Sequence, residues 1–104
     1  LDQTCRWPNK VIPCGQMSRT AMMDLVAQAQ VVCTPLGPAG PGVRLARCRA
    51  GGFDIGNNMV HTGWALAYRP DTSPYVVTQD KARKARRGLW KGTFALPWVW
   101  RRNH

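Results

Sequence analysis

Acidic residues are scarce in this sequence. Its 104 residues include five aspartates and no glutamate, against 15 lysines and arginines, which gives a formal net charge of +10. Such an excess favours a polyanionic partner, namely nucleic acid, an acidic polysaccharide or an anionic membrane surface, over a merely solvated basic surface. It also argues against a two-metal phosphodiesterase, which needs several convergent carboxylates. The aspartates are instead scattered at positions 2, 24, 54, 71 and 80.

Long apolar runs are absent as well. No segment approaches the roughly 20 apolar residues that span a membrane, and no signal peptide is visible. The chain does not begin with methionine, so we expect a processed form or a fragment, with any export signal upstream. Its length predicts one domain, residues 1–104.

Cysteine is present in an even number, at positions 5, 14, 33 and 48. In a small basic domain this predicts two disulfides and an oxidising compartment, either periplasmic or secreted. Metal binding and free thiols are the alternatives. However, no Cys-x-x-Cys occurs, and His61 and His104 are not spaced to complete a zinc site. The cysteine count alone permits three pairings.

Hydrophobic periodicity predicts three helices, over residues 16–30, 55–62 and 78–87. Asp54 and Thr78 are expected to cap the starts of the second and third helices, and Gly63 and Gly88 to end them. Short strands are predicted at 31–33 and 43–49, around a loop rich in glycine and proline. Residues 1–15 are predicted to be irregular. The tryptophan-rich C-terminal part is expected to pack back on the core.

The two strands suggest a disulfide pairing. If they form a symmetric hairpin, Cys33 falls opposite Cys48, and opposed cysteines in an antiparallel pair can approach disulfide geometry. This arrangement leaves Cys5 to pair with Cys14. The loop closed by that second bridge is short, so we expect it to stabilise the fold less than a long-range bridge.

The third predicted helix is strongly basic. Only Asp80 balances its cationic side chains, which are Lys81, Arg83, Lys84, Arg86 and Arg87. A charge run on a helix is usually a solvated surface, but this excess of cations over acids favours a contact with a polyanion. We therefore take Lys81 and Lys84 as candidate substrate-binding residues.

An ordered set of motifs resembles the staphylococcal-nuclease-like (thermonuclease) family, especially its small exported bacterial members. After the cysteine-containing hairpin comes Gly-Gly-Phe-Asp-Ile-Gly-Asn-Asn-Met-Val-His-Thr-Gly-Trp-Ala-Leu-Ala-Tyr at 51–68. Tyr75 then precedes a helix containing Asp80-Lys81-Ala82-Arg83. The remaining elements are Arg87-Gly88-Leu89-Trp90, Gly92, Phe94 and Pro97-Trp98-Val99-Trp100-Arg101. The resemblance covers nearly the whole chain.

This resemblance implies an α+β fold, an incomplete OB-type barrel with a β-hairpin and three helices. Active members of the family cut DNA and RNA with calcium, two arginines that hold the phosphate, and a glutamate that activates water. Arg44 matches the second catalytic arginine, and Tyr68 resembles a tyrosine at the edge of the nucleotide pocket. The first arginine, the calcium-binding aspartates and the glutamate have no counterpart in this chain. It is N-terminally truncated relative to the family, and we expect no cofactor and no metal site in it.

Two expectations follow for its partners and activity. Missing strands would leave the hairpin edges unpaired, and such edges tend to be covered or to pair with another chain, so a homodimer or a strand-swapped assembly is predicted. The leading functional hypothesis is a nuclease homologue that is inactive in this form. The alternative is a non-enzymatic protein that binds polyanions, for example in exopolysaccharide (succinoglycan) biosynthesis, with which small homologues are associated by name.

Overall fold

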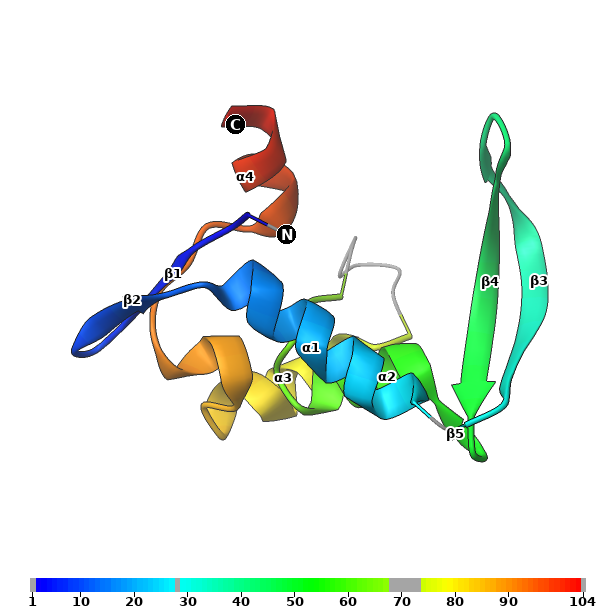
Figure 1. The fold of residues 1–104 in the computed structure, drawn as a ribbon, viewed down its shortest axis with the longest axis horizontal. Coiled ribbons are helices and arrows are strands. Elements are labelled where there is room, and N and C mark those ends of the chain that lie inside the picture. The colour runs from blue at the N-terminus through cyan, green and yellow to red at the C-terminus, as the bar shows by residue number, and fades with distance from the viewer. Residues whose placement is uncertain (1, 28, 68–73, 104) are drawn as a thin grey trace.

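The computed structural model describes residues 2–27, 29–67 and 74–103. Its helices and strands follow the chain in a mixed α+β order (Figure 1). They are β1 (Cys5–Trp7), β2 (Lys10–Ile12), α1 (Cys14–Val26), β3 (Val31–Gly40), β4 (Val43–Ala50), β5 (Phe53–Asp54), α2 (Ile55–His61), α3 (Val76–Lys84), the 3₁₀-helix η1 (Gly88–Lys91) and α4 (Pro97–Asn103).

Two small antiparallel sheets organise these elements. In one, β1 pairs with β2, and in the other β3, β4 and β5 follow in that order. A further bridge joins Arg6 to Thr93, with hydrogen bonds of 2.8 Å in both directions. This bridge ties the N-terminal hairpin to the segment after η1, although the two lie far apart in the sequence.

The apolar core lies in two clusters that meet at Trp64. One cluster is built on the buried Cys5, Cys14, Ile12 and Leu89, and the other contains Ala50, Ile55 and Met59. Trp64 packs against both. Trp7 packs against the first cluster, so among the described residues the tryptophans packed against the two clusters are Trp7 and Trp64, both half-buried, rather than those of the C-terminal part.

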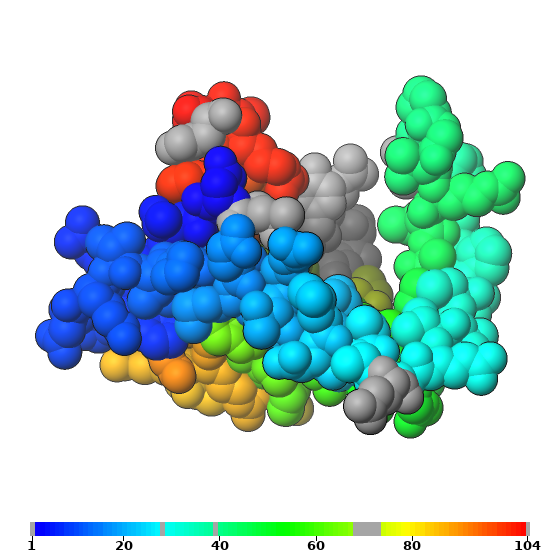
Figure 2. Space-filling model, viewed as in Figure 1, coloured from blue at the N-terminus to red at the C-terminus, as the bar shows by residue number. Residues whose placement is uncertain are grey.

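The hairpin of β3 and β4 contacts the body only near its base and projects as a separate arm (Figures 1 and 2). Ala50, at the base, is fully buried, whereas Val32 and Leu45 are 60% and 54% exposed. An arm of this kind leaves apolar side chains in solvent that a packed sheet would cover.

Both predicted disulfides are present. Cys33 and Cys48 are direct partners in the register of β3 and β4, and they form one bridge. Cys5 and Cys14 form the other, and their side chains are almost fully buried in the first core cluster. The pairing is thus confirmed, but the symmetric hairpin is not: β3 continues through the predicted loop to Gly40, and the register shifts between Pro35 and Gly37 and again between Pro38 and Gly40.

Several local predictions are wrong. The first and third helices begin earlier and end earlier than predicted, and a fourth helix, α4, forms in the tail. Residues 5–7 and 10–12 form a hairpin, where irregular chain was predicted. Thr78 does not cap α3, because the N-cap is Tyr75 and no side-chain bond is made there. Gly88 does not end α3 but begins η1, four residues beyond Lys84.

Other local predictions are confirmed. Asp54 caps α2 by accepting a hydrogen bond from the Asn57 amide at 2.9 Å. Gly63 follows the end of α2 with φ of +82°, and a Cβ built there would lie 2.1 Å from the Arg87 carbonyl oxygen. Only glycine fits both the backbone conformation and this contact. Within the described residues, no helix is long and apolar enough to cross a membrane.

Candidate functional site

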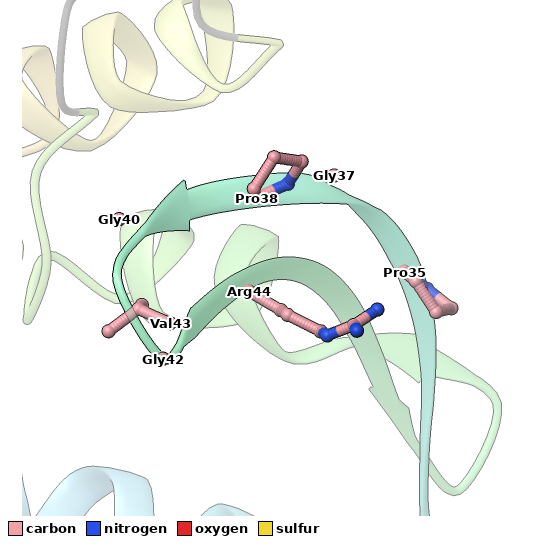
Figure 3. Close-up of a pocket in the computed structure, with 7 residues that line it drawn as sticks. All are labelled: Pro35, Gly37, Pro38, Gly40, Gly42, Val43 and Arg44. Atoms are coloured by element: carbon pink, nitrogen blue, oxygen red, sulfur yellow. The ribbon is translucent and has the colours of Figure 1, made fainter.

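Arg44 lies near the tip of the hairpin, on β4, opposite Pro38 of β3 (Figure 3). It is exposed and lines a hollow of about 680 Å³. The rest of this hollow is formed by Pro35, Gly37, Pro38, Gly40, Gly42 and Val43. Arg44 is thus the single charged side chain of a concave surface made of small residues. Such a surface could admit an anion but holds no acid or base to act on one.

Lys81 and Lys84, the predicted substrate-binding residues that the structure describes, are not brought to Arg44. Lys81 is exposed on α3, and Lys84 on the same helix pairs with Asp80 at 3.0 Å. Helix α3 belongs to the body, and the tip of the hairpin stands well away from it (Figure 1). Tyr68 lies outside the described residues. The predicted site residues that the structure describes therefore form two separate basic regions.

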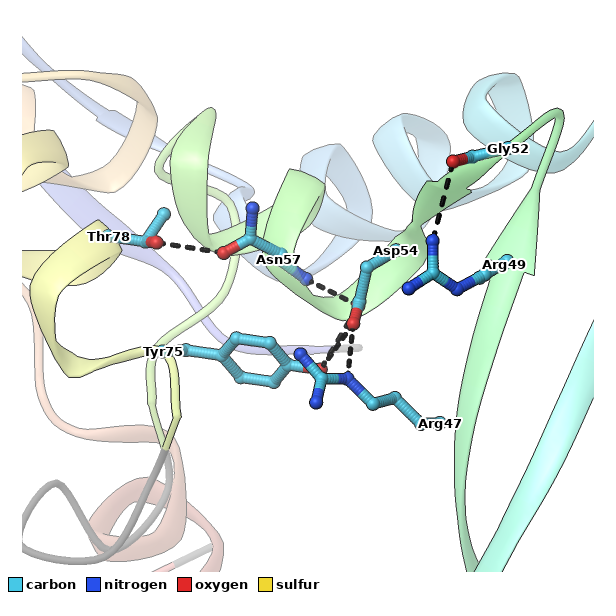
Figure 4. A network of polar contacts seen from close by, with 7 residues as sticks. All are labelled: Arg47, Arg49, Gly52, Asp54, Asn57, Tyr75 and Thr78. Carbon is cyan, nitrogen blue, oxygen red and sulfur yellow. Dashed lines mark hydrogen bonds and ion pairs between the residues drawn. The ribbon is translucent and has the colours of Figure 1, made fainter.

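A polar cluster that the sequence analysis did not predict joins the hairpin to the body (Figure 4). Arg47 of β4 donates through Nε to Asp54 Oδ2 at 2.5 Å. The Tyr75 hydroxyl donates to the same carboxylate, at 3.0 and 3.2 Å from its two oxygens. The Arg47 guanidinium also lies 5.6 Å from the centre of the Tyr75 ring. Three elements therefore converge on one carboxylate.

This Asp54 cluster extends along α2 to α3. Asp54 receives the Asn57 amide as the cap of α2, and the Asn57 side-chain oxygen accepts a 2.8 Å bond from Thr78 Oγ1. Thr78, expected to be a helix cap, is instead a cross-link between two helices. The network fixes the base of the hairpin against α2 and α3.

The electrostatics of the cluster favour an ionised carboxylate beside a neutral phenol. Burial alone would raise the pKa of Asp54. Hydrogen bonds from the Asn57 amide, Arg47 and Tyr75 outweigh it and hold that pKa below its usual value. Burial and the bond to Asp54 raise the pKa of Tyr75. The bond to Asp54 raises the pKa of Arg47, which stays charged.

The acidic residues that the structure describes are not gathered into a metal-binding group. Ca²⁺ takes six to eight oxygen ligands, with carboxylates prominent among them. Among the residues that the structure describes, no three acidic, histidine or cysteine side chains lie together as a metal-binding group. Asp54 is engaged by Arg47, and Asp80 by Arg83 and Lys84. Asp54 and Asp80 therefore serve as partners for cations of the protein itself, whereas Asp2 and Asp24 are exposed and take part in none of these ion pairs.

One sequence signal could have pointed to the Asp54 cluster. Arg47 continues the alternation of Val43 and Leu45 along β4, so it shares a strand face with apolar side chains. An arginine in such a position commonly needs a carboxylate partner. Tyr75 gave no signal of its own, because its position depends on how α3 packs against α2.

The family model described as "Staphylococcal nuclease homologue" matches residues 3–92. The chain is also similar to an "Uncharacterized endonuclease" of Escherichia coli O157:H7, with 34% identity over 98 residues. A second "Uncharacterized endonuclease", of Escherichia coli, has the same identity over the same length. No solved structure gives a significant match.

The chain is shorter than these relatives. Each match covers 90% of this chain but 64% of the relative. Segments that the relatives possess therefore lie outside the compared region.

Proposed function

Because the chain belongs to the staphylococcal nuclease homologue family, we propose that it binds the phosphate backbone of nucleic acid and does not itself hydrolyse it. The observation that supports this proposal is how the charged side chains of the protein are distributed and paired. The few acids neutralise a minority of the cations, and no carboxylate group is arranged for a metal within the described residues. The charge that attracts a polyanion is thus present, while the described residues hold no cluster of carboxylates suited to calcium.

The basic surface supports the binding half of the proposal. Among the described residues, ion pairs occupy Arg47, Arg83 and Lys84. Arg44, Lys81 and Arg86 are exposed and take part in none of these pairs. Cations that neutralise phosphates release condensed counterions, which makes binding strong at low salt and steeply dependent on salt.

Fluorescence anisotropy with a labelled 20-base-pair DNA of random sequence tests this half. We expect binding at low salt and a linear fall of log K with log salt concentration, with a slope near −0.9 for each phosphate contacted. Arg44→Gln should lower the slope if the hairpin takes part, with Arg44→Lys as the control that keeps the charge. No binding at 20 mM salt would contradict the proposal. Binding to an acidic polysaccharide alone would favour the accessory function in exopolysaccharide synthesis.

The second half of the proposal concerns calcium. The described acids do not fit a calcium site, so we derive no metal-assisted step for this chain. Isothermal titration with CaCl₂ is expected to give no binding heat at submillimolar calcium. A saturable site in that range would show that acids outside the described residues, or rearranged ones, form a metal centre.

The relatives carry the name endonuclease and are longer than the matched region. We propose that nuclease activity in a longer protein would need acidic residues from outside this chain, and that the hairpin is part of an OB-type barrel which such residues complete. Adding the segments that flank this chain in its gene should then give calcium-dependent cleavage. An extended protein that binds calcium but leaves DNA intact would contradict this.

We also propose that the present chain pairs with a second copy of itself along β3. This strand has no partner on its outer edge within the described sheet, and Val32 and Leu36 are exposed beside it. Sedimentation equilibrium should show a dimer that Val32→Lys dissociates. A monomer at all concentrations up to 1 mM would rule this out.

The two disulfides support a periplasmic or secreted location.

A further inference from the structure

Helix α3 ends in a conformation that normally belongs to glycine. Ala85 is the C-cap, and Arg86 follows it with φ of +54°. The Arg86 amide donates to the Arg83 carbonyl and the Arg87 amide to the Ala82 carbonyl, both at 3.1 Å. These two bonds define a Schellman motif, in which the residue at the position of Arg86 is left-handed and usually glycine.

An arginine at this position reduces the stability of the fold. A Cβ in the left-handed region crowds the following carbonyl, so residues other than glycine, asparagine and aspartate rarely occur there. Within the described part of the chain, Arg86 is the one residue other than glycine with a positive φ. Its side chain is exposed and makes no hydrogen bond or ion pair to the described residues. No hydrogen bond or ion pair of the Arg86 side chain with the described residues therefore offsets the unfavourable backbone conformation.

The turn that presents Arg86 is firmly held. Arg87 donates through Nη1 to the His61 carbonyl at 3.1 Å, and the Leu89 amide donates to the Gly63 carbonyl at 2.9 Å. Gly63 and Gly88 allow the backbone after α2 to contact the backbone at the start of η1. The end of α2 thus holds the α3–η1 turn directly after Arg86, whose own side chain is exposed.

The neighbours of Arg86 on this turn are also basic. Residues 81, 83, 84, 87 and 91 are lysine or arginine, and Asp80 is the one acid in the stretch from Asp80 to Lys91. Asp80 is already bound by Arg83 and Lys84. Arg86 is therefore an exposed cation next to others, without a carboxylate of its own.

We propose that the α3–η1 turn is a contact surface for the sugar-phosphate backbone of nucleic acid, separate from the hairpin around Arg44, and that Arg86 makes its central phosphate contact. A guanidinium fork meets two phosphate oxygens at once, and a rigid turn limits the entropy lost when it does so. The binding energy explains why a left-handed position carries arginine at a cost in stability. This inference rests on the proposed nucleic-acid binding.

A purely structural role makes the opposite prediction for stability. Cations near the C-terminus of a helix interact favourably with its dipole, so a structural Arg86 would stabilise α3 and its loss would lower the melting temperature. The proposal instead expects the gain from relieving the left-handed arginine to exceed the loss of this dipole interaction. The sign of the change therefore separates the two roles.

The test measures stability and DNA binding on the same variants of the full 104-residue chain. Arg86→Gly should raise the melting temperature by about 4 °C. The same change should weaken binding to a 20-base-pair duplex roughly two- to tenfold and reduce the salt slope by about 0.9. Arg86→Lys keeps both the charge and the left-handed side chain, so it should retain the wild-type melting temperature and salt slope.

Arg102→Gln is the matched control for net charge, because Arg102 is exposed on α4, which lies away from α3 in Figure 1. It should leave the salt slope unchanged. If wild-type chain binds DNA and Arg86→Gly binds with the same affinity and slope, the proposed surface is wrong while the proposed function stands. If Arg86→Gly lowers the melting temperature, the structural role is correct. Loss of binding only to an acidic polysaccharide would also overturn the proposal.

Discussion

Replacing Asp54 is the most informative single change for the fold, because this carboxylate holds three elements together. In Asp54→Ala the α2 cap is lost, which costs about 1 kcal/mol. The ion pair with Arg47 adds up to about 1 kcal/mol, since the Arg47 side chain is 45% exposed and screened by solvent. Tyr75 loses its bonds to the carboxylate, which costs about 1 kcal/mol. The free energy of unfolding should therefore fall by about 2–3 kcal/mol.

Urea unfolding followed by tryptophan fluorescence and far-UV circular dichroism measures this loss. Asp54→Asn is the matched control, since asparagine caps helices as well as aspartate does and its amide oxygen can still accept a bond from Tyr75. It removes mainly the charge and should cost about 0.5–1 kcal/mol. The reasoning fails if Asp54→Ala lies within 0.5 kcal/mol of wild type, or if the two variants are equally destabilised.

Three further predictions follow from the same structure. The lowered pKa of Asp54 means that this residue's contribution to folding stability is fully present above the unfolded-state pKa near 4 and is lost as pH falls through the folded pKa. The melting temperature should therefore drop between about pH 5 and 2, and it should drop less in Asp54→Asn. Gly63→Ala should destabilise the chain by more than 2 kcal/mol, because its Cβ would lie 2.1 Å from the Arg87 carbonyl oxygen. Gly42→Ala is the control: its φ is +69°, but a Cβ there would meet nothing within 4 Å, so it should cost about 1 kcal/mol in the same urea titration. Replacing Cys5 and Cys14 together by alanine should destabilise the chain at least as much as replacing Cys33 and Cys48, despite the shorter sequence separation of 9 against 15. The first pair is buried in the core, so core packing is lost along with the constraint on the unfolded chain. Thermal unfolding of the two double variants measures the difference.

The sequence predicts those features of the fold that depend on local chemistry. Asp54 before Ile55 identifies a helix start, and Gly63 identifies a helix end, because both act on the adjacent backbone. The cysteine pairing was predicted correctly from a symmetric hairpin, although the register at Cys33 and Cys48 depends on two shifts in β3 that the sequence analysis did not predict. Ile55, Met59 and Val60 of α2 are buried as their spacing predicts.

The remaining errors come from tertiary contacts. Residues 5–7 form a strand because they pair with residues 10–12 and with Thr93, and that last contact is invisible to local patterns. Thr78 looked like a cap because of its position before a basic helix, yet Asn57 of α2 takes its hydroxyl. The prediction that Gly88 ends α3 was wrong because Arg86 already adopts the left-handed conformation.

The candidate site was likewise predicted only in part from the sequence. The sequence indicated a basic surface and named Arg44, Lys81 and Lys84, but not that the hairpin carries Arg44 away from α3. Arg47 and Tyr75 meet Asp54 only because β4, α2 and α3 converge. Arg86 was recognised as part of a charge run, whereas its left-handed backbone is a property of how α3 ends.

Incubation of the purified 104-residue chain with supercoiled plasmid tests the central claim most directly. Samples contain calcium or an excess of chelator, and a gel-shift lane of each sample reports binding. The account predicts retarded plasmid at low salt and no nicked or linear product in either condition. Cleavage that appears with calcium and disappears on chelation, in protein free of contaminating nuclease, would contradict it.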